Sequence, residues 1–277
     1  MRRLALAFLA VTPFLTGCLS QTIVIKVRPD GSGMLTRTVV MRSETARMMQ
    51  DARRGFQQER SNQPPAPRGD ELFPESEARA LAVDLGKGVN FLSTERIQTR
   101  DLEGRKATFA FRDVAALRVI QEPSPPGMTE MPEGMLDPAA ARQPLTFRFD
   151  RRADGHAVVT AVFPPAVTAP EGESGEGGEE PGATASGPLA MQAQFLKGLR
   201  ITVVLEVDGT LVRTNSPYAR GSSVTLTDVD SDVLLADTRL LWRLKGATDL
   251  EAAKGVLKDI KGMKVHLEPV TVEFAGK

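Results

Sequence analysis

The sequence predicts an α+β fold, with a mostly antiparallel sheet built from hairpins and helices packed on one face. Short segments of alternating hydrophobicity come in consecutive pairs, and several pairs are joined by Asp-Gly turns. Helical patterns are inserted between pairs, whereas a doubly wound parallel sheet would alternate helices with single strands. We expect about nine strands.

The first pair of strands is the clearest. Residues 22–28 alternate, and residues 34–41 follow the turn Pro29-Asp30-Gly31-Ser32-Gly33. A helix over 43–60 is predicted next, capped by Ser43, with an apolar stripe of Ala46, Met49, Ala52 and Phe56. After a loop over 61–72, Pro74 begins a second helix that Gly86 can end.

Later elements follow the same rules. Two further strand pairs are predicted from alternation around turns, at 89–98 with 105–112 and at 145–149 with 157–163. A fourth hairpin joins 201–207 to 211–215 through Asp208-Gly209, and single strands follow at 224–229 and 264–274. Helices are expected near 189–199, 231–245 and 249–261, and a loop at 121–144.

Residues 164–188 carry five Glu, many Gly and Pro, and no Lys or Arg. Such a segment buries too little apolar area to offset its ordering entropy, so we predict that it is disordered. The expected organisation is a cleaved signal peptide at 1–17, an N-terminal α+β part at 18–163, this acidic segment, and a C-terminal α+β part at 189–277. Both parts are expected to complete one body.

An internal similarity relates Ile23–Val27 and its turn to Val203–Val207 and its turn. Duplication would explain it, but two hairpins with the same turn chemistry would also look alike.

Composition excludes several classes of function. Among 277 residues, 35 Lys and Arg balance 35 Asp and Glu, whereas nucleic-acid binding normally needs a basic excess. A single Cys excludes an internal disulfide and a Cys-based zinc cage. No Walker A, Gly-x-Ser-x-Gly or His-Glu-x-x-His motif is present. We therefore expect no cofactor, no bound metal and no catalytic residue.

The N-terminus has the organisation of a bacterial export signal. Arg2 and Arg3 precede an apolar run over Leu4–Leu15, which is too short to span about 30 Å of hydrocarbon. Leu15-Thr16-Gly17-Cys18 then resembles the lipobox of bacterial lipoproteins. A secreted protein with a chance Cys at its cleavage site is the alternative.

The lipobox resemblance implies that Cys18 receives diacylglycerol on its thiol and a further fatty acyl chain, such as palmitate, on its new amino group. Leu19, in place of Asp, resembles the pattern of lipoproteins that reach an outer membrane. Removing residues 1–17 takes away two of the 35 basic residues and leaves a slightly acidic chain, so the anchor alone should hold it at the membrane.

The hairpin after the lipobox carries a second resemblance. Ile23-Val24-Ile25-Lys26-Val27, followed by Pro29-Asp30-Gly31-Ser32-Gly33, is similar to a group of α+β bacterial lipoproteins without an assigned function. The hairpin and first helix also resemble LppM-type lipoproteins of mycobacteria, whose exported domain is likened to lipid-binding modules. Neither resemblance transfers site residues.

Two groups of residues have the chemistry of metal ligands. Asp228, Asp230 and Asp232 resemble the start of a calcium loop, but Val233 and Arg239 stand where an EF-hand needs Gly and Glu. We favour a helix N-cap there. Met128, Met131 and Met135 could hold Cu(I), or fill apolar space on the body.

The remaining candidates are single residues. His156 lies in a turn, where a polar residue needs no special role, and His266 lies in the last strand with no acid–base partner nearby in the sequence, so we expect structural or solvated roles for both. The sequence thus favours a lipid-anchored, extracytoplasmic and non-catalytic protein that binds a protein or envelope component. A carrier of a small apolar ligand such as a lipid is the alternative. An envelope hydrolase is a third, which would need His, Ser and Asp together in the fold.

Overall fold

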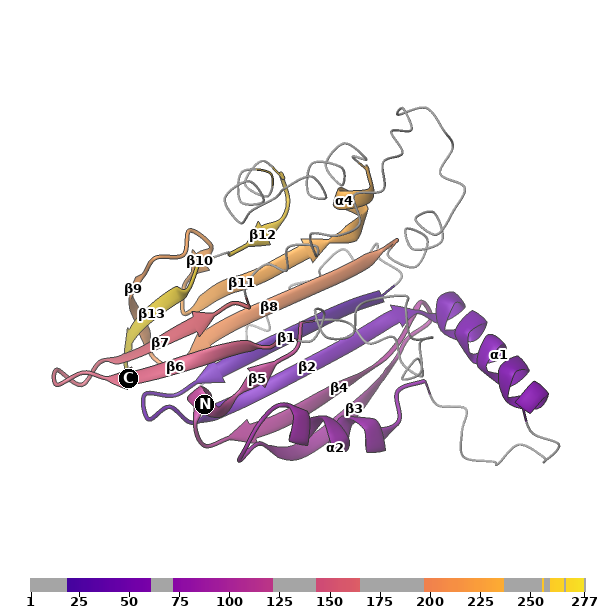
Figure 1. Ribbon diagram of the computed structural model, residues 1–277, viewed down its shortest axis with the longest axis horizontal. Helices are drawn as coiled ribbons and strands as arrows, with labels where there is room; N and C mark the ends of the chain where they lie inside the picture. The colour runs from indigo at the N-terminus through magenta and orange to yellow at the C-terminus, as the bar shows by residue number, and fades with distance from the viewer. Residues whose placement is uncertain are drawn as a thin grey trace, which may run out of the picture.

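The computed structural model describes residues 19–60, 72–121, 143–164, 197–236, 256, 260–266 and 268–276. These residues form two β-sheets, here called sheet A and sheet B, and a few helices (Figure 1). The mostly antiparallel α+β character is confirmed, because β1 with β8 is the one parallel pair within the described residues.

Sheet A has the strand order β10-β11-β8-β1-β2-β4-β3, with β12 paired to β11. Its strands are β1 Leu19–Val27, β2 Gly33–Arg42, β3 Asn90–Gln98, β4 Leu102–Phe111, β8 Leu199–Val207, β10 Ala219–Arg220, β11 Ser223–Asp230 and β12 Lys264–Val265. Sheet B has the order β5-β6-β7-β13-β9. Its strands are β5 Arg118–Val119, β6 Leu145–Arg151, β7 Ala157–Val162, β9 Thr210–Thr214 and β13 Val270–Ala275. The described helices are α1 Ser43–Arg60, α2 Glu75–Asp84, the 3-10 helix η1 Val114–Ala116 and α4 Ser231–Ala236.

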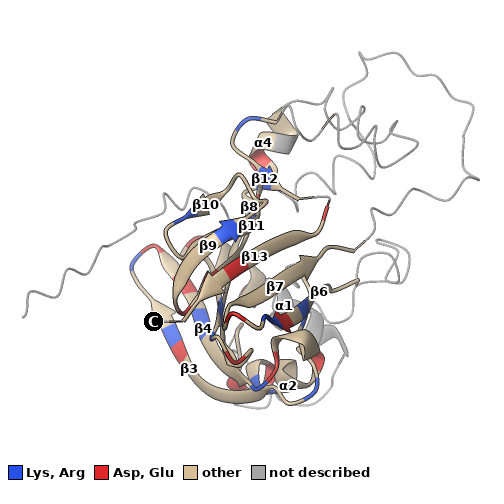
Figure 2. Cartoon of the chain, turned by 90° about the vertical axis from the view of Figure 1, so that its left-hand side faces the viewer, with Lys and Arg blue, Asp and Glu red and all other residues tan. Residues whose placement is uncertain are grey.

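One hydrophobic core joins the two sheets. Alternation places Ile23, Ile25 and Val27 of β1 on the inner face of sheet A, where each is buried. Sheet B contributes Val159 and Phe274 to the same core. Figure 2 shows β6, β7 and β13 as a layer beside the curved sheet A. Strands from before and after the acidic segment contribute to this core, and β1 pairs directly with β8.

A second sheet covers the face on which we expected a layer of helices. Of the described helices, α2 reaches the main core, through Ala78, Leu81 and Ala82. Helix α1 instead joins a small satellite cluster with Met41 and Leu72. The expectation missed this because a strand of sheet B and a strand of sheet A have the same period of two residues.

The hairpin predicted at 201–207 and 211–215 is wrong. Strand β8 stays in sheet A, whereas β9 pairs with β13 in sheet B. The chain changes sheets at Gly209, where an added Cβ would lie 2.0 Å from the carbonyl oxygen of Ala275. The single strand predicted at 264–274 is likewise divided into β12 and β13, and Pro269, which lacks an N–H, lies in the break.

The other predicted strands and the helices at 43–60 and after Pro74 are confirmed. The helix predicted near 231–245 is described as α4 over Ser231–Ala236. Residues 165–196 and 122–142 lie outside the described residues, as does most of 249–261, so the disorder, loop and helix predicted there stay predictions. Residue 199, predicted as helical, begins β8.

The two ends of sheet A differ. At one end, called the helix end, β1 and β8 begin, while β2 and β11 lead directly into α1 and α4 (Figure 1). The opposite end, called the turn end, carries the β1–β2 and β6–β7 turns. The β1–β2 turn contacts strand β6 near this end, because a Cβ on Gly31 would lie 3.0 Å from the Phe149 ring. The two ends therefore present different surfaces.

Candidate functional site

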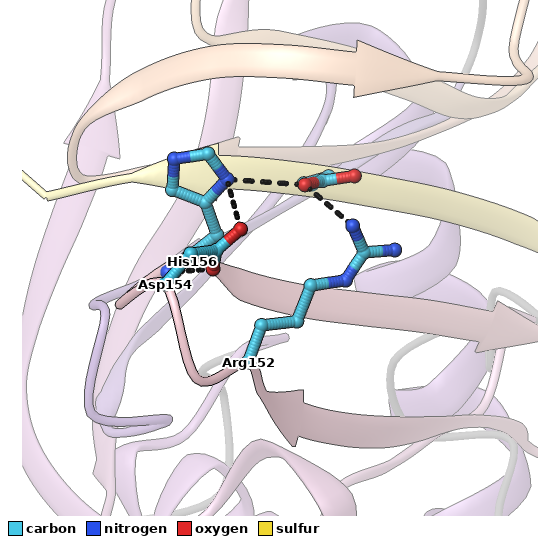
Figure 3. Close-up of polar contacts among 4 residues, drawn as sticks. Arg152, Asp154 and His156 are labelled. Carbon is cyan, nitrogen blue, oxygen red and sulfur yellow. Dashed lines mark hydrogen bonds and ion pairs between the residues drawn. The ribbon is translucent and has the colours of Figure 1, made fainter.

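A polar cluster at the turn end is the most developed candidate site. The β6–β7 turn is closed by a hydrogen bond of 2.8 Å from the Arg152 amide to the His156 carbonyl. Asp154 Oδ1 accepts from the His156 amide at 3.0 Å, and Gly155 adopts a φ of +84° that favours glycine. The turn therefore holds the side chains of Arg152, Asp154 and His156 on one side (Figure 3).

Glu273 of β13 is the centre of this cluster. Its Oε1 atom lies 2.8 Å from Arg152 Nη1 and 3.1 Å from His156 Nδ1. His156 Nδ1 also lies 3.5 Å from Asp154 Oδ2. Glu273 is 8% exposed, and its neighbours Val272 and Phe274 point into the core, so its carboxylate lies on the outer face of sheet B.

The arrangement offers two kinds of chemistry. The guanidinium and a protonated imidazole can neutralise Glu273 as an ion-paired group. The oxygen atoms of Asp154 and Glu273, together with the His156 nitrogen, are also potential metal ligands, since they lie within 4.8 Å of one another. The structure therefore gives His156, which we expected only as a polar turn residue, two carboxylate neighbours.

A second polar pair joins Ser216 and His266. Ser216 Oγ lies 3.1 Å from His266 Nε2, and Nε2 also lies 3.2 Å from the carbonyl oxygen of Thr225. A carbonyl oxygen only accepts, so Nε2 carries the proton and donates it to Thr225. Burial lowers the pKa of His266, and the bond to Thr225 partly opposes this.

This pair lacks the arrangement of a hydrolase. With Nε2 protonated, its lone pair is not available to take a proton from Ser216. Within the described residues, no carboxylate bonds His266 Nδ1 to hold the opposite tautomer. The rings of Tyr218 and Phe163 lie 5.2 and 5.8 Å from the His266 ring, so the imidazole is packed between aromatic groups.

The predicted N-cap at Asp228–Asp232 is confirmed. Asp230 Oδ1 accepts from the Asp232 amide at 3.0 Å, at the start of α4. Asp228 pairs with Arg200 at 3.1 Å and with Lys264 at 3.7 Å. Asp232 accepts from the Gly198 amide at 2.7 Å. Each of the three carboxylates thus has its own partner within the protein.

Several predicted residues lie outside the described residues. They are Cys18 at the lipobox and the methionines Met128, Met131 and Met135. The described chain begins at Leu19, directly after Cys18, and β1 begins at that residue.

Sequence reasoning missed both polar groups. Glu273 is separated from His156 by 117 residues, and Ser216 from His266 by 50. The sequence shows Glu273 as an acidic residue between apolar ones in the final strand. That pattern does not indicate which residue it will contact.

Comparison with known proteins gives little. No protein-family model matches the chain, and no curated protein matches it. Among solved structures, the NMR structure of the folded domain of LppM from Mycobacterium tuberculosis is similar at a TM-score of 0.32 and 9% sequence identity, over 94% of this chain and 91% of that one. A similarity at this level assigns no function. Among the described helices, none has both the length and the apolar character needed to cross a membrane.

Proposed function

We propose that this chain is a lipid-anchored protein of the bacterial cell envelope that works by binding a protein or envelope component, without catalysis. The observation that carries the proposal is the lipobox at Leu15–Cys18, followed without a spacer by the first strand of a folded body. In a cell with two membranes, the anchor would lie in the outer membrane and the body would face the periplasm.

The position of Leu19 within sheet A would determine how the lipid anchor orients the folded body. Leu19 is in register with Met41 of β2 and with Leu199 of β8, and its amide donates to the Gly198 carbonyl at 3.1 Å. Consecutive Cα atoms are about 3.8 Å apart, so a lipid on Cys18 would hold sheet A close to the membrane. The helix end would then face the bilayer and the turn end the opposite side.

The described core gives the carrier alternative no support. The sheets meet through a continuous set of buried apolar side chains, among which Ile25, Leu205 and Phe274 are 0% exposed. A small hollow of about 50 Å³ lies elsewhere, lined by Lys26, Arg28, Gly33, Met34 and Asp208. On the same measure one water molecule needs about 10–15 Å³, so this hollow has room for a few water molecules and is too small for a lipid.

Anchoring is tested in a Gram-negative host by comparing the full chain with a variant in which a cleavable secretory signal without a lipobox replaces residues 1–18. The wild type should fractionate with membranes, and mass spectrometry should find its first mature residue to be a multiply acylated Cys18. The variant should be soluble in the periplasm. A soluble wild type, or a variant that remains with membranes, would refute the anchor.

The mode of action needs a second measurement. The native mass of the periplasmic chain of residues 19–277 should equal that of the polypeptide. An excess of a few hundred daltons that denaturation removes would instead identify a carrier. Hydrolysis of ester or amide substrates that is abolished by Ser216→Ala would show an enzyme.

A further inference from the structure

We propose that Asp154, His156 and Glu273 form a binding site for a divalent cation of the zinc type at the turn end. The ligands would be Asp154 Oδ2, His156 Nδ1 and Glu273 Oε1 (Figure 3). The site is independent of the lipid anchor, because its residues lie at the opposite end of the body from Leu19.

The spacing of the three atoms fits a small coordination sphere. Zinc binds nitrogen and oxygen at about 2.0–2.2 Å, which places neighbouring ligands of a tetrahedron about 3.4 Å apart. His156 Nδ1 lies 3.1 Å from Glu273 Oε1 and 3.5 Å from Asp154 Oδ2. All three atoms lie within 4.8 Å of one another, so a cation can contact all three groups after small rotations of the side chains.

The protein holds these ligands in place by bonds that a metal would not break. Asp154 uses its other oxygen, Oδ1, to accept from the His156 amide. Glu273 lies inside sheet B, paired with Val158 of β7 on one side and with Arg213 of β9 on the other. Cation binding would therefore cost little ordering entropy.

Ion pairing within the protein leaves part of the cluster unsatisfied. The Arg152 guanidinium pairs with Glu273, and a single imidazole nitrogen faces both carboxylates. A proton on Nδ1 points at one acceptor, and the 3.5 Å contact with Asp154 is at the limit of a hydrogen bond. A divalent cation would satisfy both carboxylates together.

The ligand set selects the class of metal. One imidazole and two carboxylates suit zinc, cobalt or nickel, whereas calcium takes six to eight oxygens and Cu(I) prefers sulfur. The side chains of His156 and Asp154 are 32% and 55% exposed, so a cation can enter from solvent and water can complete its coordination.

Arg152 would compete with a cation at this site. Its guanidinium lies 2.8 Å from the Glu273 oxygen that the cation would use. A second positive charge so close opposes the cation, so Arg152→Gln should strengthen metal binding. An ion-paired turn with no metal function would gain no metal affinity from this change.

The test uses the full mature chain in detergent, with Zn²⁺ heat of binding and Co²⁺ visible absorption as readouts. We expect one ion per chain and cobalt bands of high intensity, typical of four ligands. Asp154→Asn, at an exposed position, and His156→Gln, at a half-buried one, should each weaken binding at least about tenfold, as should Glu273→Gln. His266→Gln is the matched control and should bind like the wild type.

Circular dichroism of each variant separates lost binding from lost folding. Absence of binding by the folded wild type would overturn the proposal. So would binding that Asp154→Asn and His156→Gln leave unchanged, because the ion would then lie elsewhere, such as at Met128, Met131 and Met135.

Discussion

Arg37 of β2 donates two hydrogen bonds to the side-chain oxygen of Gln21 on β1, from Nε at 3.1 Å and from Nη2 at 2.7 Å. Both residues lie on the inner face of sheet A, and Gln21 is 0% exposed. Burial lowers the pKa of Arg37, while the charge of Glu77 opposes this shift. No carboxylate of the described residues lies within ion-pair distance of Arg37, so an amide oxygen is its direct partner.

We predict that Gln21→Leu lowers the free energy of unfolding by about 2 kcal/mol, because hydrogen bonds to charged groups contribute about 1.5–3 kcal/mol. The loss is limited because Gln21 Nε2 has no partner, and its removal relieves a buried donor. The double variant Gln21→Leu/Arg37→Met should recover most of the stability. Urea unfolding of all four chains measures this, and strictly additive losses would contradict it.

Gly104 should tolerate no side chain. A Cβ there would lie 2.1 Å from the Val39 carbonyl oxygen and 2.8 Å from Val40 Cα, both backbone atoms of the neighbouring strand. We predict a loss of about 3 kcal/mol for Gly104→Ala, at the upper part of the range for overpacking. Gly88→Ala is the control, since its Cβ meets nothing within 4 Å and its φ of +81° should cost only about 1 kcal/mol. Equal losses in thermal unfolding would show that the contact at Gly104 is relieved cheaply.

His266 should make stability depend on pH. Its pKa is lowered from 6.5 by burial, so the folded chain binds fewer protons than the unfolded chain as pH falls through that value. Stability should therefore decrease on acidification below about pH 6.5 and stop decreasing below the folded-state pKa. His266→Gln, which keeps a donor for Thr225, should remove this component.

The check is urea unfolding of both chains between pH 8 and pH 5. Other titrating groups are common to both, so the difference in unfolding free energy isolates His266. A difference that is constant with pH, or that favours the wild type at low pH, would contradict the prediction.

Local patterns predicted much of the fold, because alternation in Ile23, Ile25 and Val27 shows directly which face is buried. The same pattern does not show to which of the two sheets a strand belongs. It therefore predicts a hairpin of β8 with β9, whereas β9 pairs with β13. The structure also bears on the similarity between the segments Ile23–Val27 and Val203–Val207. Ile23–Val27 and Val203–Val207 are parallel neighbours in register, and both face the same core. A shared environment is therefore sufficient to explain their likeness, whether or not a duplication occurred.

The candidate site was less predictable for a physical reason. A cap such as Asp230 and Asp232 is formed within one turn of chain, so its residues are readable from their order. Glu273 and His156 meet only because β13 pairs with β7, a strand that lies far from it in the sequence. Nothing in the residues around either one encodes that pairing.

Arg79 of α2 allows two surface interactions to be compared. Its guanidinium lies 4.4 Å from the centroid of the Phe91 ring and bonds Glu75 at 2.5 Å, where the two charged side chains are 61% and 48% exposed. Exposed ion pairs one helical turn apart contribute about 0.3–0.5 kcal/mol, whereas a cation over an aromatic face contributes about 0.5–1 kcal/mol and covers apolar surface as well. We therefore predict that Arg79→Ala costs about 1 kcal/mol and Glu75→Gln at most about 0.5 kcal/mol. In about 1 M salt, screening should abolish the effect of Glu75→Gln and leave most of that of Arg79→Ala. If both losses were equal at low salt and vanished together at high salt, the ion pair within α2, rather than the contact with the Phe91 ring of β3, would account for the contribution of Arg79.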